Sequence, residues 1–119
     1  MARKRRGQLI HGWISIDKPS GSTSAQVTSK VRRFLDAAKA GHGGTLDPMA
    51  TGVLPIALGE ATKTVSYVMN GKKRYRFTVS WGEERTTDDF EGKITTTSGH
   101  RPTKQSILTI LPQFTGAIE

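Results

Sequence analysis

The apolar residues of this chain recur at two spacings, which predict one clear helix and one clear strand. After three possible N-cap residues, Ser22 to Ser24, the spacing is three and four residues, which places apolar side chains on one stripe of a helix. That stripe consists of Val27, Val31, Phe34, Leu35 and Ala38. From Arg74 to Trp81 apolar and polar residues alternate, as in a strand with one buried face. The apolar face of that strand consists of Tyr75, Phe77, Val79 and Trp81.

Shorter segments predict two further strands and two further helices. The strands are expected over residues 12–17 and 53–58. Pro55 should place the second of them at a sheet edge or a bulge, because proline lacks the N–H that a central strand donates to its neighbour. The helices are expected within residues 59–69 and between Pro102 and Pro112.

The polar segment 82–92 is expected to be a loop that joins the strand at 74–81 to a β-prone segment at 93–97. It is rich in acidic residues but lacks the residue order of a calcium-binding loop, so a solvated hairpin loop is the preferred interpretation. The order of the elements predicts an α+β fold with a mixed, largely antiparallel sheet and flanking helices. One domain over residues 9–119 should follow a disordered basic arm over residues 1–8.

Charge narrows the choice of partners. The 119 residues carry 18 Lys and Arg against 10 Asp and Glu, a net charge of +8, and a small domain this basic attracts polyanions such as nucleic acid. Four of the positive charges lie in the first six residues, and an arm of this kind can equally be a solubilising tail. On the predicted helix a solvated basic face is favoured over a dedicated RNA-binding face. The cations concerned are Lys30, Arg32, Arg33 and Lys39.

The composition also excludes several classes of protein. The chain has no cysteine, which excludes a disulfide scaffold, a zinc ribbon and an iron–sulfur protein. No run approaches the ~18 to 20 apolar residues of a membrane span, and the basic start is not followed by the apolar segment of a signal peptide. We therefore expect a soluble, cytoplasmic protein without a membrane partner.

The strongest candidate chemistry lies in the segment 41–52, GHGGTLDPMATG. Its glycines allow a ligand to approach the backbone, and Asp47 is its single carboxylate. Up to Pro48 it is too rich in glycine for regular structure, and it lacks the Gly-Lys-Ser/Thr ending of a phosphate-binding loop. Asp47 is either a helix N-cap or a catalytic carboxylate, and the residues alone favour neither. His42 has no partners at metal-ligand spacing, so contact with a nucleotide is favoured over a metal site.

Several motifs, taken together and in order, resemble one family. They are DKPSG at 17–21, Thr23-Ser24, GHGGTLDP at 41–48, ATGVL at 50–54, GEATK at 59–63, Lys73 with Tyr75, and the loop at 87–92. In this order they resemble the bacterial TruB family of tRNA pseudouridine synthases over essentially all of the chain beyond the arm. The segment 41–48 is the most specific of them.

The resemblance implies an enzyme that isomerises uridine 55 in the T loop of tRNA to pseudouridine. Its partner would be the T arm of tRNA, with no metal, no organic cofactor, no guide RNA and no protein partner. The resemblance also implies that Asp47 is the catalytic carboxylate, that Tyr75 stacks on the flipped base and that His42 contacts the T loop. Without the resemblance, Tyr75 would be interpreted as a core residue.

The remaining candidate substrate-binding residues are Gly43, Gly44, Thr45, Lys18, Arg74 and Arg76. Of these, the lysine would support the wall of the active site and the two arginines would meet phosphates. The chain resembles only the first part of the family's catalytic domain. It lacks the later strands, whose arginine pairs with the catalytic aspartate, and the C-terminal RNA-binding domain, so we expect little activity from it alone.

Two alternatives stay open. One is a non-catalytic basic RNA-binding module in which Asp47 is a helix N-cap. The other is a guide-dependent synthase of the archaeal or eukaryotic type, against which the runs at 47–52 and 59–63 favour the bacterial, stand-alone type.

Overall fold

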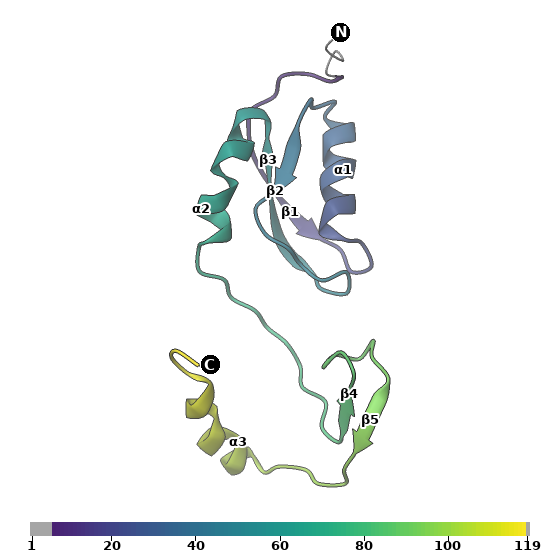
Figure 1. Ribbon diagram of the computed structural model, residues 1–119, viewed down its shortest axis with the longest axis vertical. Coiled ribbons are helices and arrows are strands. Elements are labelled where there is room, and N and C mark those ends of the chain that lie inside the picture. Colours follow the sequence, from purple (N-terminus) through teal and green to yellow (C-terminus); the bar gives the residue numbers. More distant parts are fainter. Residues whose placement is uncertain (1–5, 119) are drawn as a thin grey trace. The chain divides into compact units, whose positions relative to one another are not determined.

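The chain forms two compact units, Met1–Lys73 and Arg74–Glu119. The computed structural model describes residues 6–118, and Figure 1 labels their helices and strands. Of the basic arm expected over residues 1–8, residues 1–5 lie outside the described residues. Gln8 belongs to the fold of the first unit, because it forms a parallel bridge with Ala37 and its carbonyl accepts a hydrogen bond of 2.8 Å from the Ala38 N–H.

The first unit is a three-stranded antiparallel sheet with a helix packed against it (Figure 1). Strands β1 (Gly12–Lys18) and β2 (Ala40–His42) pair on either side of the central strand β3 (Gly52–Leu58). Helix α1 (Ser24–Phe34) contacts β2 and β3. Alternate residues of β3 meet the helix in the buried core, since they lie on one face of the strand. The core consists of Val27, Ala37, Leu54, Ile56 and Leu58.

Pro55 lies in the central strand, so the prediction of an edge or bulged position is wrong. It stands opposite Ser15 of β1, and on the other side its carbonyl accepts a hydrogen bond of 2.8 Å from the Gly43 N–H. In an antiparallel ladder the N–H and C=O of one residue point to the same neighbour. The missing N–H of Pro55 therefore faces Gly43, just beyond the end of β2 at His42, and the β1–β3 ladder loses no hydrogen bond.

Helix α1 begins as predicted but ends earlier than its apolar stripe. Thr23 is the N-cap: its hydroxyl accepts from the Gln26 N–H at 3.0 Å, and the Gln26 side chain accepts from the Thr23 N–H at 2.9 Å. Val31 and Leu35 pack against the core as predicted. Phe34 is 87% exposed, so its predicted place in the core is wrong. It lies on the flank of the stripe, at the last residue of the helix.

Two short helical segments end the first unit, which confirms the prediction for residues 59–69. They are the 3-10 helix η1 (Gly59–Thr64) and helix α2 (Val65–Met69). Gly59 starts this segment with a φ of +58°, and a Cβ there would lie 2.2 Å from the Ile10 carbonyl oxygen. Glycine is required at this position both by its left-handed backbone and by the lack of space.

Residues 71–80 have no regular structure, so the strand predicted over residues 74–81 is wrong. The alternating apolar side chains are all exposed by about half or more, from 47% at Trp81 to 79% at Phe77. Alternation identifies the side chains that share a face, but a strand also needs a neighbour for its backbone hydrogen bonds. No strand of residues 6–118 pairs with this segment.

The second unit contains a hairpin, but its predicted first strand at residues 74–81 is wrong, because the strand that pairs lies within the segment expected to be a loop. Strand β4 (Glu83–Arg85) pairs antiparallel with β5 (Ile94–Thr97). The Arg85 guanidinium donates to the carbonyls of Phe90 and Gly92, at 3.0 Å each, and so holds the connecting loop from within.

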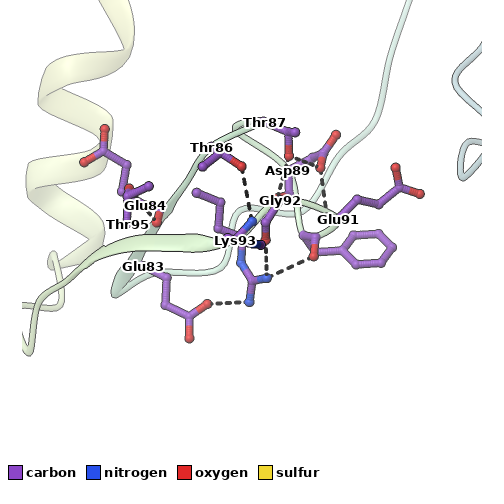
Figure 2. Close-up of polar contacts among 11 residues, drawn as sticks. Glu83, Glu84, Thr86, Thr87, Asp89, Glu91, Gly92, Lys93 and Thr95 are labelled. Carbon is purple, nitrogen blue, oxygen red and sulfur yellow. Dashed lines mark hydrogen bonds and ion pairs between the residues drawn. The ribbon is translucent and has the colours of Figure 1, made fainter.

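Asp89 organises the tip of the same loop (Figure 2). Its Oδ1 accepts hydrogen bonds from the Thr87 hydroxyl at 2.6 Å and from the Glu91 N–H at 2.9 Å. The hydrogen bond from Thr87 is the largest cause that holds the pKa of Asp89 below its ordinary value. The acidic residues Asp88, Asp89 and Glu91 thus lie in a solvated hairpin loop, as predicted, whereas Glu83 and Glu84 lie in β4.

Helix α3 (Lys104–Ile110) begins after the N-cap Thr103, and the 3-10 helix η2 (Leu111–Phe114) follows it. The helix predicted between Pro102 and Pro112 is therefore confirmed. No described residue of the second unit is buried, so the described core belongs to the first unit. Two antiparallel sheets with helices confirm the predicted α+β class. Within residues 6–118, no helix combines the length and the apolar character needed to cross a membrane.

Candidate active site

The loop between β2 and β3 presents Asp47 as an exposed carboxylate. Residues 47–50 form a turn, closed by a hydrogen bond of 2.9 Å from the Ala50 N–H to the Asp47 carbonyl. No helix begins at Asp47 in the described part of the chain, so the N-cap interpretation of this residue is wrong. The segment is also more regular than predicted, because Gly41 and His42 form the end of β2.

Ser24, at the start of α1, holds the backbone immediately before Asp47. Its side chain is buried, and its hydroxyl accepts from the Leu46 N–H at 2.9 Å and donates to the Leu46 carbonyl at 3.1 Å. One hydroxyl thus satisfies both backbone groups of Leu46, as a neighbouring strand residue would.

The DKPSG turn holds the backbone immediately after Asp47. The buried ammonium of Lys18 donates to the Pro48 carbonyl at 3.1 Å, and the Gly21 N–H donates to the same oxygen at 2.7 Å. The Ser20 hydroxyl donates to the carbonyl of Met49 at 3.0 Å. Backbone on both sides of Asp47 is therefore tied to the segment 18–24.

Lys18 serves this structure rather than a ligand. Besides Pro48, its Nζ donates to the carbonyls of Pro19 and Ser22, at 2.8 Å each. An ammonium has three N–H groups, and all three are used by backbone oxygens. Lys18 therefore anchors the backbone around Asp47, and its role in the wall of an active site stays a prediction.

The candidate contact residues before Asp47 differ in what they can contact. His42 is the last residue of β2, and Gly43, Gly44 and Thr45 follow it. The His42 Nδ1–H donates to the Gly44 carbonyl, which leaves Nε2 as the acceptor of the neutral ring. Gly43 is buried, and a Cβ there would lie 3.0 Å from Val68 Cγ1, so its role is packing rather than contact with a ligand. Space is open at Gly44, and Thr45 is exposed.

Arg74, Tyr75 and Arg76 begin the second unit and are exposed in a segment without regular structure. Tyr75 is 62% exposed, so its interpretation as a core residue is wrong. The roles of these three residues toward a substrate stay predictions.

The first unit thus offers a carboxylate on an anchored loop, open to a large ligand. A carboxylate in such a place can act as a nucleophile, as a base or as a countercharge to a cation. Among the described residues, no group of three His, Asp or Glu side chains is placed to hold a metal ion.

The anchoring residues Ser20, Gly21 and Ser24 were not predicted as part of the site. The available signal was their position in the motifs at 17–21 and 23–24, which carried the resemblance without giving these residues a role. Their partners lie more than twenty residues away in the sequence, beyond the reach of any local pattern.

Comparison with known proteins shows which family the sequence matches. Residues 32–119 match the model of the TruB family pseudouridylate synthases, N-terminal domain. The chain is 64% identical over 119 residues to tRNA pseudouridine synthase B of Rhodospirillum rubrum, covering all of this chain and 39% of that protein. It is 62% identical over 116 residues to tRNA pseudouridine synthase B of Bradyrhizobium diazoefficiens, covering 98% of this chain and 34% of that protein. The chain therefore spans less than half the length of these relatives.

Among solved structures, the chain is similar to one in the crystal structure of an archaeal box H/ACA sRNP Nop10–Cbf5 complex. The match is 53% identical and covers 48% of this chain and 18% of that one, with a TM-score of 0.46.

Proposed function

Because this chain belongs to the TruB family of pseudouridylate synthases, we propose that the protein isomerises uridine 55 in the T loop of tRNA to pseudouridine, with Asp47 as its catalytic carboxylate. Relatives named tRNA pseudouridine synthase B support the choice of tRNA as substrate. The T arm is the part recognised, without a guide RNA, and the reaction takes place in the cytoplasm.

One observation carries the proposal: Asp47 is exposed while the backbone on both sides of it is anchored. Leu46 is bonded to Ser24, and Pro48 is bonded to Lys18. A catalytic group gains most when it is held in place before the substrate arrives, because no ordering is then needed during the reaction. A merely solvated surface aspartate needs no such anchoring.

The chemistry fits a single positioned carboxylate. The reaction breaks the bond between N1 of uracil and C1′ of the ribose, turns the base and joins its C5 to the same carbon. C5 loses its hydrogen as a proton and N1 gains a proton, so there is no net oxidation or hydrolysis. The target nucleotide is first flipped out of its stack, at a cost of a few kcal/mol. The Asp47 carboxylate then attacks C1′, removes the 2′ hydrogen or stabilises a positive sugar.

Other residues of the chain have supporting roles in this proposal. Tyr75 stacks on the flipped uracil, an interaction worth ~1 to 3 kcal/mol for a base on an aromatic ring. Arg74 and Arg76 contact phosphates, which dominate the affinity of RNA for proteins. His42 contacts the T loop through Nε2, because its Nδ1–H is already bonded to Gly44.

The test uses the full-length protein and a T-arm hairpin, with no guide RNA present. Asp47→Asn keeps the size and polarity of the side chain and removes its charge. We expect the variant to form pseudouridine at least about a thousandfold more slowly, as when an essential catalytic group is removed. Asp36→Asn is the matched control, since Asp36 is also exposed and has a φ of +50° that asparagine adopts readily.

The rate of pseudouridine formation is measured on a hairpin with uridine at the target. A second hairpin with 5-fluorouridine at the target is examined by mass spectrometry for a persistent adduct or a rearranged nucleoside. Pseudouridine formation by Asp47→Asn at the rate of the parent protein would refute the catalytic role. Binding of the hairpin without any pseudouridine formation by the parent would instead favour the non-catalytic RNA-binding module.

A further inference from the structure

We infer that Ser24 is a positioning residue for Asp47, because its hydroxyl holds the peptide group between Leu46 and Asp47 in place. The inference rests on the proposed function and adds a residue to it. Ser24 is 3% exposed, so its side chain is not accessible to a substrate. Its effect on the reaction must therefore be exerted through Asp47.

Two peptide planes flank the Cα atom of Asp47, and each is held by a hydrogen bond. The carbonyl of Leu46 and the N–H of Asp47 belong to one rigid plane, and the Ser24 hydroxyl bonds that carbonyl at 3.1 Å. The carbonyl of Asp47 belongs to the next plane and accepts from the Ala50 N–H at 2.9 Å. With both planes held, φ and ψ of Asp47 are set, and only the side-chain torsions remain to be chosen.

Within the described residues, Ser24 supplies the only side chain that bonds either of these two planes. Lys18 and Ser20 act one and two residues further on, at the carbonyls of Pro48 and Met49. A hydroxyl is required at Ser24 because the group must donate to one backbone atom and accept from another. Alanine offers neither.

The experiment compares three variants of the full-length protein. Ser24→Ala removes both hydrogen bonds to Leu46, and Ser24→Thr restores the hydroxyl. Thr28→Ala is the matched control, because Thr28 is also buried in α1 and its hydroxyl donates only to the Ser24 carbonyl of the same helix, at 2.8 Å. Pseudouridine formation on the T-arm hairpin is followed in a single turnover with enzyme in excess.

This assay separates positioning from folding. A misplaced carboxylate lowers the rate constant, whereas a partly unfolded enzyme lowers the amplitude and leaves the rate constant of the folded molecules unchanged. Because a displacement of about 1 Å can cost a hundredfold in rate, we expect a fall of ten- to a hundredfold in the rate constant of Ser24→Ala. Ser24→Thr should recover to within a few-fold of the parent, and Thr28→Ala should keep its rate constant.

Two results of the single-turnover assay would overturn the inference. One is a rate constant of Ser24→Ala within twofold of the parent, and the other is an equal fall in Ser24→Thr, which would show that the hydroxyl is not the cause. Hydrogen exchange of the Leu46 amide is measured on the same samples and does not depend on activity. Faster exchange in Ser24→Ala supports the contact even if the parent forms no pseudouridine, a result that would refute the proposed function alone. Unchanged exchange refutes the contact.

Discussion

Lys18 Nζ donates a hydrogen bond of 3.1 Å to the carbonyl of Pro48, a residue thirty positions further along the chain. The side chain that makes this contact is fully buried. Of the three hydrogen bonds of the ammonium, this one has the partner farthest away in the sequence. It joins the end of β1 to the loop that carries Asp47. The stability of that loop should therefore depend on a buried cation.

Lys18→Met tests this dependence, because it keeps the length of the side chain and removes its donors. Three backbone carbonyls then lose a partner, and a charged donor contributes about 1.5 to 3 kcal/mol per hydrogen bond in favourable cases. We expect the free energy of unfolding, measured with urea, to fall by about 2 to 4 kcal/mol. Lys30→Met, at an exposed position of α1, should change it by less than about 0.5 kcal/mol. Equal losses in the two variants would contradict this account of Lys18.

Gly43 and Gly44 are neighbours with opposite tolerance for a side chain. A methyl group on Gly43 would lie 3.0 Å from Val68 Cγ1 and 3.2 Å from Trp13 Cζ3, whereas nothing lies within 4 Å of a methyl group on Gly44. Overpacking of this kind typically costs about 1 to 3 kcal/mol. Gly43→Ala should therefore lower the free energy of unfolding by that amount, and Gly44→Ala should leave it nearly unchanged. The thermal unfolding temperatures of the two variants are compared with that of the parent. A larger loss of stability in Gly44→Ala than in Gly43→Ala would show that the packing around Gly43 is not as described.

Asp89 should make the hairpin loop sensitive to acid. Hydrogen bonds from Thr87 and from the Glu91 N–H hold the pKa of Asp89 below its ordinary value. A carboxyl group whose pKa is lower in the folded than in the unfolded state stabilises the fold above the unfolded pKa, and this contribution disappears as the pH falls through the folded pKa. The Glu91 amide resonance should therefore titrate at a pH below the ordinary range of an aspartate.

NMR titration of the Glu91 amide measures this midpoint directly. Asp89→Asn keeps an oxygen acceptor that does not titrate, so the part of the Glu91 resonance shift that is due to Asp89 should be lost in this variant. A midpoint at the ordinary pKa of aspartate in the parent would contradict the hydrogen bonds shown in Figure 2.

The segment between the two units should be the first to be cut by trypsin in the 119-residue chain. Lys72, Lys73, Arg74 and Arg76 are all exposed and lie where the backbone has no regular structure, and such segments are the preferred sites of proteolysis. Arg32 and Arg33 are also exposed but lie within α1. Mass spectrometry of early digests should find cuts at residues 72–76 before any cut in α1. Early cuts within α1 would show that the helix is less stable than its capping box and core contacts indicate.

Elements that depend on a few neighbouring residues were predicted well from the sequence. Helix α1 is predicted by the possible N-caps at 22–24 and the apolar spacing after them, and α3 by its position between Pro102 and Pro112. A helix satisfies its own backbone hydrogen bonds, so such local signals suffice. Strand β1 was predicted over nearly the same residues. Elements that depend on a partner were predicted poorly. Tyr75 and Phe77 alternate with polar residues, yet no strand within residues 6–118 pairs with them. Pro55 was assigned to an edge because its neighbours cannot be known from the sequence.

The candidate site divides in the same way. Asp47 was identified from its glycine-rich surroundings and from the resemblance, both of which are visible in the sequence. Its anchoring by Ser24 and Lys18 was not predicted, since it pairs residues 22 and 30 positions apart. Nor was the burial of Gly43, which depends on a side chain of α2. A sequence shows which groups are available, whereas the fold decides which of them meet.

Pro55 also determines where the loop of Asp47 begins. A strand beside β3 can exchange both hydrogen bonds with a residue only if that residue has an N–H, and Pro55 returns none to Gly43. The chain is therefore released from the sheet at that point, four residues before Asp47. Replacing Pro55 by valine would let β2 pair with β3 over one more residue. The loop that carries Asp47 would then be shorter, although none of its own residues had been changed.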